Sequence, residues 1–300
     1  MKESFRKNKT DYLNYLHTVR NLSDNSIRAY THDLDIFSAY LDTESLSFNN
    51  LGSKKVRSFV ADLSRKKLKD SSINRIISSI KSFYKYCVRY DVLDINPFSH
   101  VRSISNNRKI PDVLSFAEIN NMIELTGNSF YGIRDRVILE MLYSTGCRVS
   151  ELTGLKVEDI DLKKRMALVH GKGRKARWVF LTRGTADELA SYLPVRKNYI
   201  NKSIGLESVN LIINRNGNSI SVRGIHYLIE KYTRAVGVSK HVSPHTFRHT
   251  FATHMLNSGA GIRIVQEMLG HSSIATTQLY THVGMDRLKD VYRGAHPHGR

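Results

Sequence analysis

The sequence predicts a mainly α fold of the α+β class, with an N-terminal bundle of about four helices and a larger mixed helical domain that carries a small antiparallel β-sheet. Three observations support this prediction. Apolar residues recur every three or four positions through much of residues 11–95, which is the period of a helix. A polar, basic stretch without periodicity follows at 99–111. Alternation of period two, typical of strands, first appears within residues 157–181.

The N-terminal helices are defined by their apolar faces and their ends. Residues 23–41 carry one apolar face, and Ser23 or Asp24 can cap this helix. A second helix follows a Ser71-Ser72 cap, and its apolar residues are Ile73, Ile76, Ile80 and Phe83. Asn96-Pro97 is expected to end the last helix, because the residue before a proline is disfavoured in helical geometry.

The second domain begins with helices and continues with a hairpin. Ser115-x-x-Glu118 is a capping box. A helix over 134–143 is expected to stop at Thr145-Gly146. Met166 to His170 and Trp178 to Leu181 predict a β-hairpin with Gly171-Lys172-Gly173 at its tip.

Two further segments complete the second domain. The apolar run 209–213, followed by Asn216-Gly217 and residues 219–222, predicts a third strand or a second hairpin. The remainder is expected to be helical, with Ser243 as N-cap and Pro244 in the first turn of a helix.

Charge indicates the kind of partner. Lys and Arg number 46 against 27 Asp and Glu, which gives a formal net charge of +19 in 300 residues. The surplus is divided almost evenly between the residues before and after position 110, so we expect both halves to face a polyanion. No stretch approaches the roughly 20 apolar residues of a membrane span, and we expect no membrane partner.

The two cysteines, Cys87 and Cys147, are too few and too far apart for a disulfide framework or a thiolate metal site. The first ten residues are polar and lack the apolar run of a signal peptide. We therefore expect a cytoplasmic protein.

His245 and Arg248 are the first candidates for chemistry. They lie three residues apart, on one face of the first helical turn, where backbone N–H groups and the helix dipole also favour a phosphate. His245 and His249 could instead hold zinc, but the glutamate of an H-E-x-x-H motif and a third ligand are missing nearby. We therefore expect no metal and no cofactor.

Four other residues could complete a site that attacks a phosphodiester. Arg148 follows a glycine break, and Glu151, three residues on, can hold its guanidinium by a charge-assisted hydrogen bond. Lys172 lies at the hairpin tip, where an ammonium can protonate a departing alkoxide. The G-x-x-x-x-G-K-[ST] spacing of an ATP-binding loop is absent. His271 and Tyr280 follow near the end of the chain, and a phenol among cations is suited to attack on phosphorus.

In their order and local settings, these residues resemble the tyrosine recombinase (phage integrase) family, and especially its Xer-type chromosome dimer resolution recombinases. The settings are TGCRVSEL, HGKGRKAR, SPHTFRHTFATHML, MLGHSS and TTQLYTHV. Residues 22–34 and the ending Ala295-His296-Pro297-His298 resemble Xer sequences as well, so the resemblance covers nearly the whole chain. It implies a core-binding, SAM-like DNA-binding domain at 1–98, an interdomain linker at 99–112 and a catalytic domain at 113–300.

The resemblance also implies a mechanism. Tyr280 would be the nucleophile, forming a 3′-phosphotyrosine, while Arg148 and Arg248 clamp the phosphate oxygens and His271 adds a donor. Lys172 would protonate the leaving 5′-oxygen, and His245 would assist proton transfer at the tyrosine. Glu151 would orient its neighbour. No metal or cofactor is required in this scheme.

The partners that the resemblance implies are double-stranded DNA carrying a dif-like recombination site and a tetrameric synaptic complex that passes through a Holliday junction. The chain would act alone or with a second related recombinase, with or without a septal DNA translocase, in chromosome segregation. Residues 285–292, with an apolar helical face, would dock on a neighbouring protomer.

Several other functions stay open at this point. An integrase of a mobile element would share the motifs, and a type IB topoisomerase would share most of the chemistry. A non-enzymatic helical DNA-binding regulator would use the basic residues only to hold phosphate.

Overall fold

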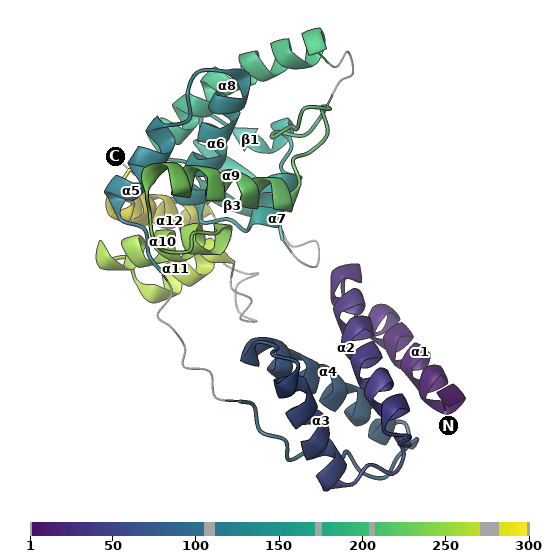
Figure 1. The fold of residues 1–300 in the computed structure, drawn as a ribbon. Coiled ribbons are helices and arrows are strands. Elements are labelled where there is room, and N and C mark those ends of the chain that lie inside the picture. The colour runs from purple at the N-terminus through teal and green to yellow at the C-terminus, as the bar shows by residue number, and fades with distance from the viewer. Residues whose placement is uncertain (1, 105–111, 172–175, 204–207, 271–281, 299–300) are drawn as a thin grey trace. The chain divides into compact units, whose positions relative to one another are not determined.

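The computed structural model describes residues 2–104, 112–171, 176–203, 208–270 and 282–298 (Figure 1). The chain divides into two compact units, Met1–Lys109 and Ile110–Arg300. The predicted architecture, mainly helical with a small antiparallel sheet in the second unit, is confirmed. No helix within the described ranges is long and apolar enough to cross a membrane.

The N-terminal unit contains four helices in the part of it that is described, as predicted. They are α1 (Lys2–Thr18), α2 (Asp24–Thr43), α3 (Ser53–Arg65) and α4 (Asp70–Arg89). Their apolar faces meet in one core rich in aromatic rings, with Phe37, Phe59 and Phe83 fully buried. Within this unit Asp33 on α2 is buried too, and its carboxylate accepts hydrogen bonds from Ser79 at 2.7 Å and Arg75 at 2.5 Å, both on α4.

The last N-terminal helix is shorter than predicted. α4 ends at Arg89, and Asp91 follows with a positive φ of 54°, so the chain leaves the helix before Asn96-Pro97. The described half of the predicted linker is bound to this helix. Lys81 donates to the Ser99 carbonyl at 2.7 Å, and Asn74 exchanges two hydrogen bonds with the backbone of Ile104.

The C-terminal unit is built around α6 (Phe130–Thr145), in which every side chain from Val137 to Thr145 is buried. Its helices before the sheet are α5 (Phe116–Glu124), α6, α7 (Val149–Gly154) and the short 3₁₀ helix η1 (Val157–Asp159). Its helices after the sheet are α8 (Arg183–Ser203), α9 (Val222–Val236), α10 (Pro244–Asn257), α11 (Ile262–Leu269) and α12 (His282–Ala295). The capping box of Ser115 and Glu118 is present at α5, and α6 ends at Gly146 with φ +57°, both as predicted.

The sheet has three antiparallel strands in the order β1 (Ile160–Asp161), β2 (Met166–His170) and β3 (Ala176–Phe180). The hairpin of β2 and β3 is confirmed, with Leu168 opposite Trp178 and His170 opposite Ala176.

The prediction of a third strand or second hairpin at 209–213 is met only in part: no regular strand forms, but Ile213 is bridged to Ser219 in antiparallel fashion around Asn216-Gly217. That segment forms isolated bridges only, and its backbone groups have other partners. Leu211 donates to the Leu155 carbonyl at 2.8 Å, and Tyr192 and Arg196 on α8 donate side-chain hydrogen bonds to the Leu211 carbonyl. These contacts leave no regular ladder, because a backbone group that is already satisfied has no need of a strand neighbour.

The C-terminal helix α12 packs on its own chain. Leu288, Tyr292 and Ala295 are buried in a cluster with residues of β2, β3, α10 and α11. The Tyr292 hydroxyl donates to the Ser144 carbonyl oxygen at 2.9 Å, which joins α12 to the end of α6. The apolar face that we expected to dock on a neighbouring protomer therefore has a partner within this unit.

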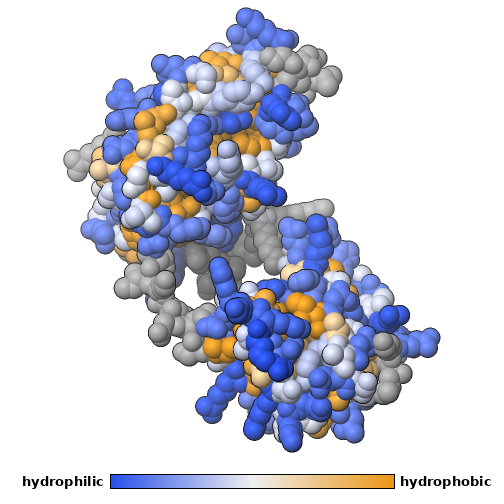
Figure 2. Space-filling model, in the orientation of Figure 1, coloured by the Kyte–Doolittle hydropathy of each residue, from blue (hydrophilic) through white to orange (hydrophobic). Residues whose placement is uncertain are grey.

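Hydrophilic side chains cover most of the face drawn in Figure 2, and hydrophobic residues appear there as separate patches.

Candidate active site

The N-terminus of α10 presents His245 and Arg248 as the sequence predicts. The Ser243 side chain accepts a hydrogen bond from the Thr246 N–H at 3.3 Å, and Pro244 occupies the first helical position. This cap fixes where the helix begins, so His245 falls in the first turn and Arg248 at the start of the second. His245 is exposed, whereas Arg248 is half-buried.

Arg248 is held by backbone carbonyls at the ends of two helices. Its Nη1 donates to Gly146 O and its Nη2 to Leu269 O, each at 2.7 Å. Burial, with the charges of Arg148 and Arg177, lowers the pKa of Arg248 to about 10, so the group stays charged at neutral pH. A guanidinium has five N–H donors, so this geometry leaves donors for an anion.

Arg148 and Glu151 form the predicted pair at the start of α7. The Arg148 backbone N–H donates to Oε2 of Glu151 and its Nη1 donates to Oε1, both at 2.8 Å. The pair is not an ordinary surface salt bridge, because the Glu151 side chain is only 1% exposed while that of Arg148 is 40% exposed. Arg148 thus spans from a buried carboxylate to the surface.

A third arginine, Arg177 on β3, belongs to the same cluster and was not among our predicted site residues. Its Nη1 and Nη2 donate to the two Glu151 oxygens at 2.7 and 2.9 Å, and its Nε donates to Met268 O at 3.0 Å. The sequence held one signal for it. Alternation along β3 places Arg177 on the same buried face as Val179, and a buried charge requires a partner.

The cluster carries an excess of positive charge. Arg148 and Arg177 bind one carboxylate, and Arg248, bound by main-chain carbonyls, lies near enough to interact with its charge, so three cations and one anion leave two positive charges unbalanced. Burial by itself would raise the pKa of Glu151, but the hydrogen bonds and charge of Arg177, followed by those of Arg148, outweigh it and hold the pKa below its usual value. An ionised Glu151 and two unbalanced arginine charges make a site for an anion with about the charge of a phosphate.

Lys172, His271 and Tyr280 lie outside the described residues. Their neighbours in the chain are described, however. In the sequence, Lys172 falls between the paired residues His170 and Ala176, and His271 directly follows Gly270. Gly270 O accepts from Arg148 at 3.4 Å, so the arginine cluster contacts the last described residue before His271.

The other histidines of α10 are not arranged as metal ligands. Nδ1 of His254 lies 2.9 Å from the Tyr143 hydroxyl, and burial lowers the pKa of His254, as expected for a packed side chain. Within the described parts of the chain, no group of three or more His, Cys, Asp or Glu side chains could hold a metal ion.

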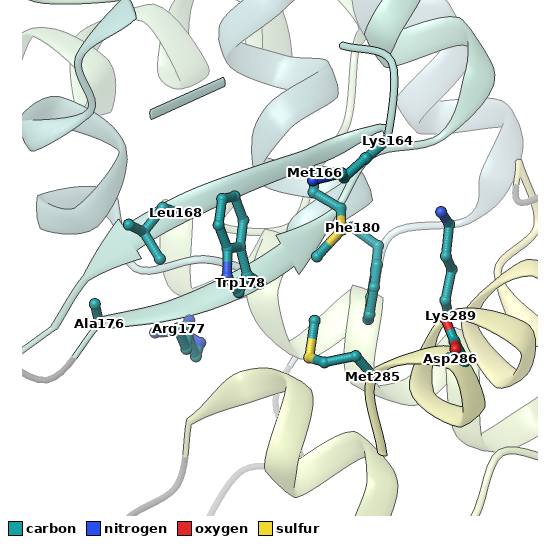
Figure 3. A pocket seen from close by; sticks show the side chains of 10 residues that line it. All are labelled: Lys164, Met166, Leu168, Ala176, Arg177, Trp178, Phe180, Met285, Asp286 and Lys289. Atoms are coloured by element: carbon teal, nitrogen blue, oxygen red, sulfur yellow. The ribbon is translucent and has the colours of Figure 1, made fainter. Parts of the chain in front are cut away.

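A pocket opens beside the cluster, between the sheet and the start of α12 (Figure 3). Its strand side is formed by Met166, Leu168, Trp178 and Phe180, and its helix side by Met285, Asp286 and Lys289. The mainly apolar lining distinguishes it from the arginine cluster, with which it shares only Arg177.

Comparison with known proteins gives the class of this fold and site. The model of the Phage integrase family matches residues 112–287, and the model of its N-terminal SAM-like domain matches residues 10–90. The chain therefore belongs to the phage integrase family, and the resemblance seen in its motifs is confirmed.

Relatives and a solved structure narrow the class. The chain is 38% identical over 297 residues to Tyrosine recombinase XerC of Treponema denticola, with 96% of this chain and 97% of the relative covered. It is 35% identical over 289 residues to Tyrosine recombinase XerD of Oceanobacillus iheyensis, covering 96% and 97%. The XerH recombinase, solved bound to a palindromic difH substrate in a post-cleavage complex, has the same fold, with a TM-score of 0.72 and 22% identity over 90% of this chain and 80% of that one. The chain is thus a Xer-type site-specific tyrosine recombinase, an enzyme that breaks and rejoins DNA.

Proposed function

We propose that this recombinase cuts DNA through Tyr280 and that Arg148 and Arg248 hold the scissile phosphate. The observation that supports this most directly is the arginine cluster, with its two unbalanced positive charges at the residues that precede His271 and Tyr280. A pentavalent phosphorane carries more negative charge than the phosphodiester from which it forms. A fixed pair of excess cations therefore stabilises the transition state more than the ground state.

The strand-cleavage step is a transfer between two oxygens. The Tyr280 oxygen bonds to phosphorus as the bond to the 5′-oxygen breaks, which leaves a 3′-phosphotyrosine and a 5′-hydroxyl. His245 takes the proton of the phenol, and Lys172 supplies the proton to the 5′-oxygen. His271 donates a hydrogen bond to a phosphate oxygen. The linkage keeps the energy of the phosphodiester, so the reverse reaction rejoins DNA without a cofactor.

The substrate that we propose is duplex DNA with a dif-like site, and the process is resolution of chromosome dimers in the cytoplasm during segregation. The XerH complex with difH DNA and the XerC and XerD relatives support this choice over the integrase of a mobile element. Four protomers would pair two such sites and pass through a Holliday junction. They would be copies of this chain, alone or with a second related recombinase, and a septal DNA translocase would act upstream.

Covalent trapping tests the proposal. The protein and its Tyr280→Phe variant are incubated with nicked duplexes from the replication-terminus region of its own chromosome, and adducts that resist denaturant are resolved. We expect an adduct with the wild type only, and equal duplex binding by both proteins, because only one hydroxyl is lost. An adduct that forms as well with Tyr280→Phe would exclude Tyr280 as nucleophile. A wild type that reacts only with DNA of a mobile element would favour the integrase role.

A further inference from the structure

Glu151 has no capacity left for a further donor. A carboxylate offers about four lone-pair sites. Four hydrogen bonds occupy those of Glu151: two from the Arg177 guanidinium, one from the Arg148 guanidinium and one from the Arg148 backbone. The buried negative charge is therefore fully satisfied inside the protein.

The two arginines do not share the carboxylate equally. Arg177 binds it with both terminal nitrogens and is 7% exposed, whereas Arg148 binds it with one terminal nitrogen and is 40% exposed. A bidentate guanidinium is the stronger partner of a carboxylate. Arg177 thus takes the larger part of the Glu151 charge, and Arg148 keeps donors directed away from it.

We propose that Arg177 is a positioning residue for strand cleavage: it neutralises Glu151, so that Arg148 keeps donors for the scissile phosphate. This inference rests on the proposed function, because the contact of Arg148 with the scissile phosphate is part of that proposal. It assigns no phosphate contact to Arg177 itself. The residue acts through Arg148.

The consequence of removing Arg177 follows from burial. A buried carboxylate without its bidentate partner costs free energy until another donor replaces it. The guanidinium already in contact is Arg148, which would turn its second terminal nitrogen to Glu151. The phosphate would then lose an arginine without any change in the residues that touch it.

A simpler role for Arg177 has to be distinguished from this one. Its Nε also binds Met268 O, and a Cβ placed on Gly270 would lie 3.0 Å from its Cδ, so Arg177 packs closely under the end of α11. Arg177 could therefore act only as a strut between β3 and α11. If Arg177 acts only as a strut, the effect of removing it on the cleavage rate should not depend on the charge of Glu151. The test uses that difference.

The test is a set of variants in the full-length protein: Arg177→Met, Arg177→Lys, Glu151→Gln and the double variant Arg177→Met with Glu151→Gln. Single-turnover cleavage is measured on the nicked duplex that traps the wild type. We expect Arg177→Met to cleave about 100-fold more slowly, of the order seen when one stabilising donor is lost. The double variant should cleave about tenfold faster than Arg177→Met, because a neutral glutamine does not need the positive charge of Arg148 as a partner. Arg183→Met, which removes an arginine that is 79% exposed, is the matched control and should cleave like the wild type.

A second readout addresses the charge directly. With a neutral methylphosphonate at the scissile position there is less charge to stabilise, so the gap between wild type and Arg177→Met should shrink to below about tenfold. If Arg177→Met does not fold, as judged by circular dichroism, Arg177→Lys carries the test. This variant keeps the charge but loses the bidentate geometry, and its rate should also rise when Glu151→Gln is added.

The outcomes separate the inference from the function on which it rests. Cleavage by Arg177→Met at the wild-type rate overturns the inference alone. A double variant no faster than Arg177→Met, with an unchanged gap on methylphosphonate, shows a strut and also overturns it. A wild type that forms no adduct on any duplex removes the proposed function, and the inference with it.

Discussion

The hydroxyl of Tyr292 donates to the carbonyl oxygen of Ser144, two residues before the glycine whose carbonyl accepts from Arg248. The C-terminal helix and Arg248 are therefore attached to the same end of α6. Anything that displaces α12 acts on a helix end that also positions the site.

Tyr292→Ala should destabilise the C-terminal unit by about 3–5 kcal/mol, because the ring is 2% exposed and its loss leaves a cavity beside Phe180. Tyr292→Phe removes only the hydrogen bond and should cost about 1 kcal/mol. Urea unfolding followed by fluorescence of Trp178 measures both, since this is the one tryptophan of the chain and lies in that unit. Equal stabilities for the alanine variant and the wild type would show that α12 contributes nothing in cis.

Arg248→Lys should slow strand cleavage by about 10²–10³-fold while duplex affinity stays within about twofold. An ammonium keeps the charge, but it cannot bridge Gly146 O, Leu269 O and a phosphate in one plane. Adduct formation and gel-shift titration give the two quantities. Arg234→Lys, on a side chain that is 79% exposed, serves as the control. A lysine variant that cleaves at the wild-type rate would contradict the clamp.

Glu151→Gln should lower stability by about 3 kcal/mol near neutral pH, because it breaks a buried ion pair. The folded-state pKa of Glu151 is lowered, so its contribution is present above the unfolded value of about 4.3 and is lost as pH falls through the folded pKa. Melting curves from pH 7 to pH 3 should therefore converge for the variant and the wild type at the acid end. A difference that persists unchanged to pH 3 would mean that folding does not lower the pKa of Glu151.

His296→Gln should make the acid sensitivity of the fold weaker. Burial, aided by the charges of His298 and His254, lowers the pKa of His296 from 6.5 to about 3. The unfolded chain therefore binds a proton that the native chain excludes, and stability falls as pH drops from 6.5 towards 3. At pH 5 the wild type should have lost about 2 kcal/mol through this group. The exposed His226→Gln is the control, and parallel melting profiles for all three proteins would refute the assignment.

The helical parts of the fold could be predicted because their signals are local. Period and caps gave α2 within a few residues and the starts of α5 and α10, and a glycine gave the end of α6. That 209–213 forms no regular strand could not be predicted, because its backbone groups are satisfied by side chains of α8 and by Leu155, which are distant in sequence. Local pattern carries no information about such partners.

The candidate site likewise contains residues that could be predicted from local signals and one residue that could not. Arg148, Glu151 and Arg248 could be named from motif and spacing, and the structure brings them together. Arg177 could not be named in this way, because an additional arginine in a basic hairpin has, in the sequence, the same pattern as a residue that contacts DNA. Its role depends on a carboxylate 26 residues away. What the sequence lacked was the identity of that partner.

The arginines of the cluster donate many of their hydrogen bonds to main-chain carbonyl oxygens, those of Gly146, Met268, Leu269 and Gly270. A carbonyl is the same whatever side chain its residue carries, so the side chain of Leu269 is constrained by its burial in the core and not by the hydrogen bond to Arg248. Gly146 is different, because its φ is +57° and a Cβ there would lie 2.5 Å from the ring of Phe251. Saturation mutagenesis should therefore find that Gly146 accepts no side chain, whereas Leu269 accepts other apolar residues of similar size, because its main-chain oxygen makes the hydrogen bond with the arginine.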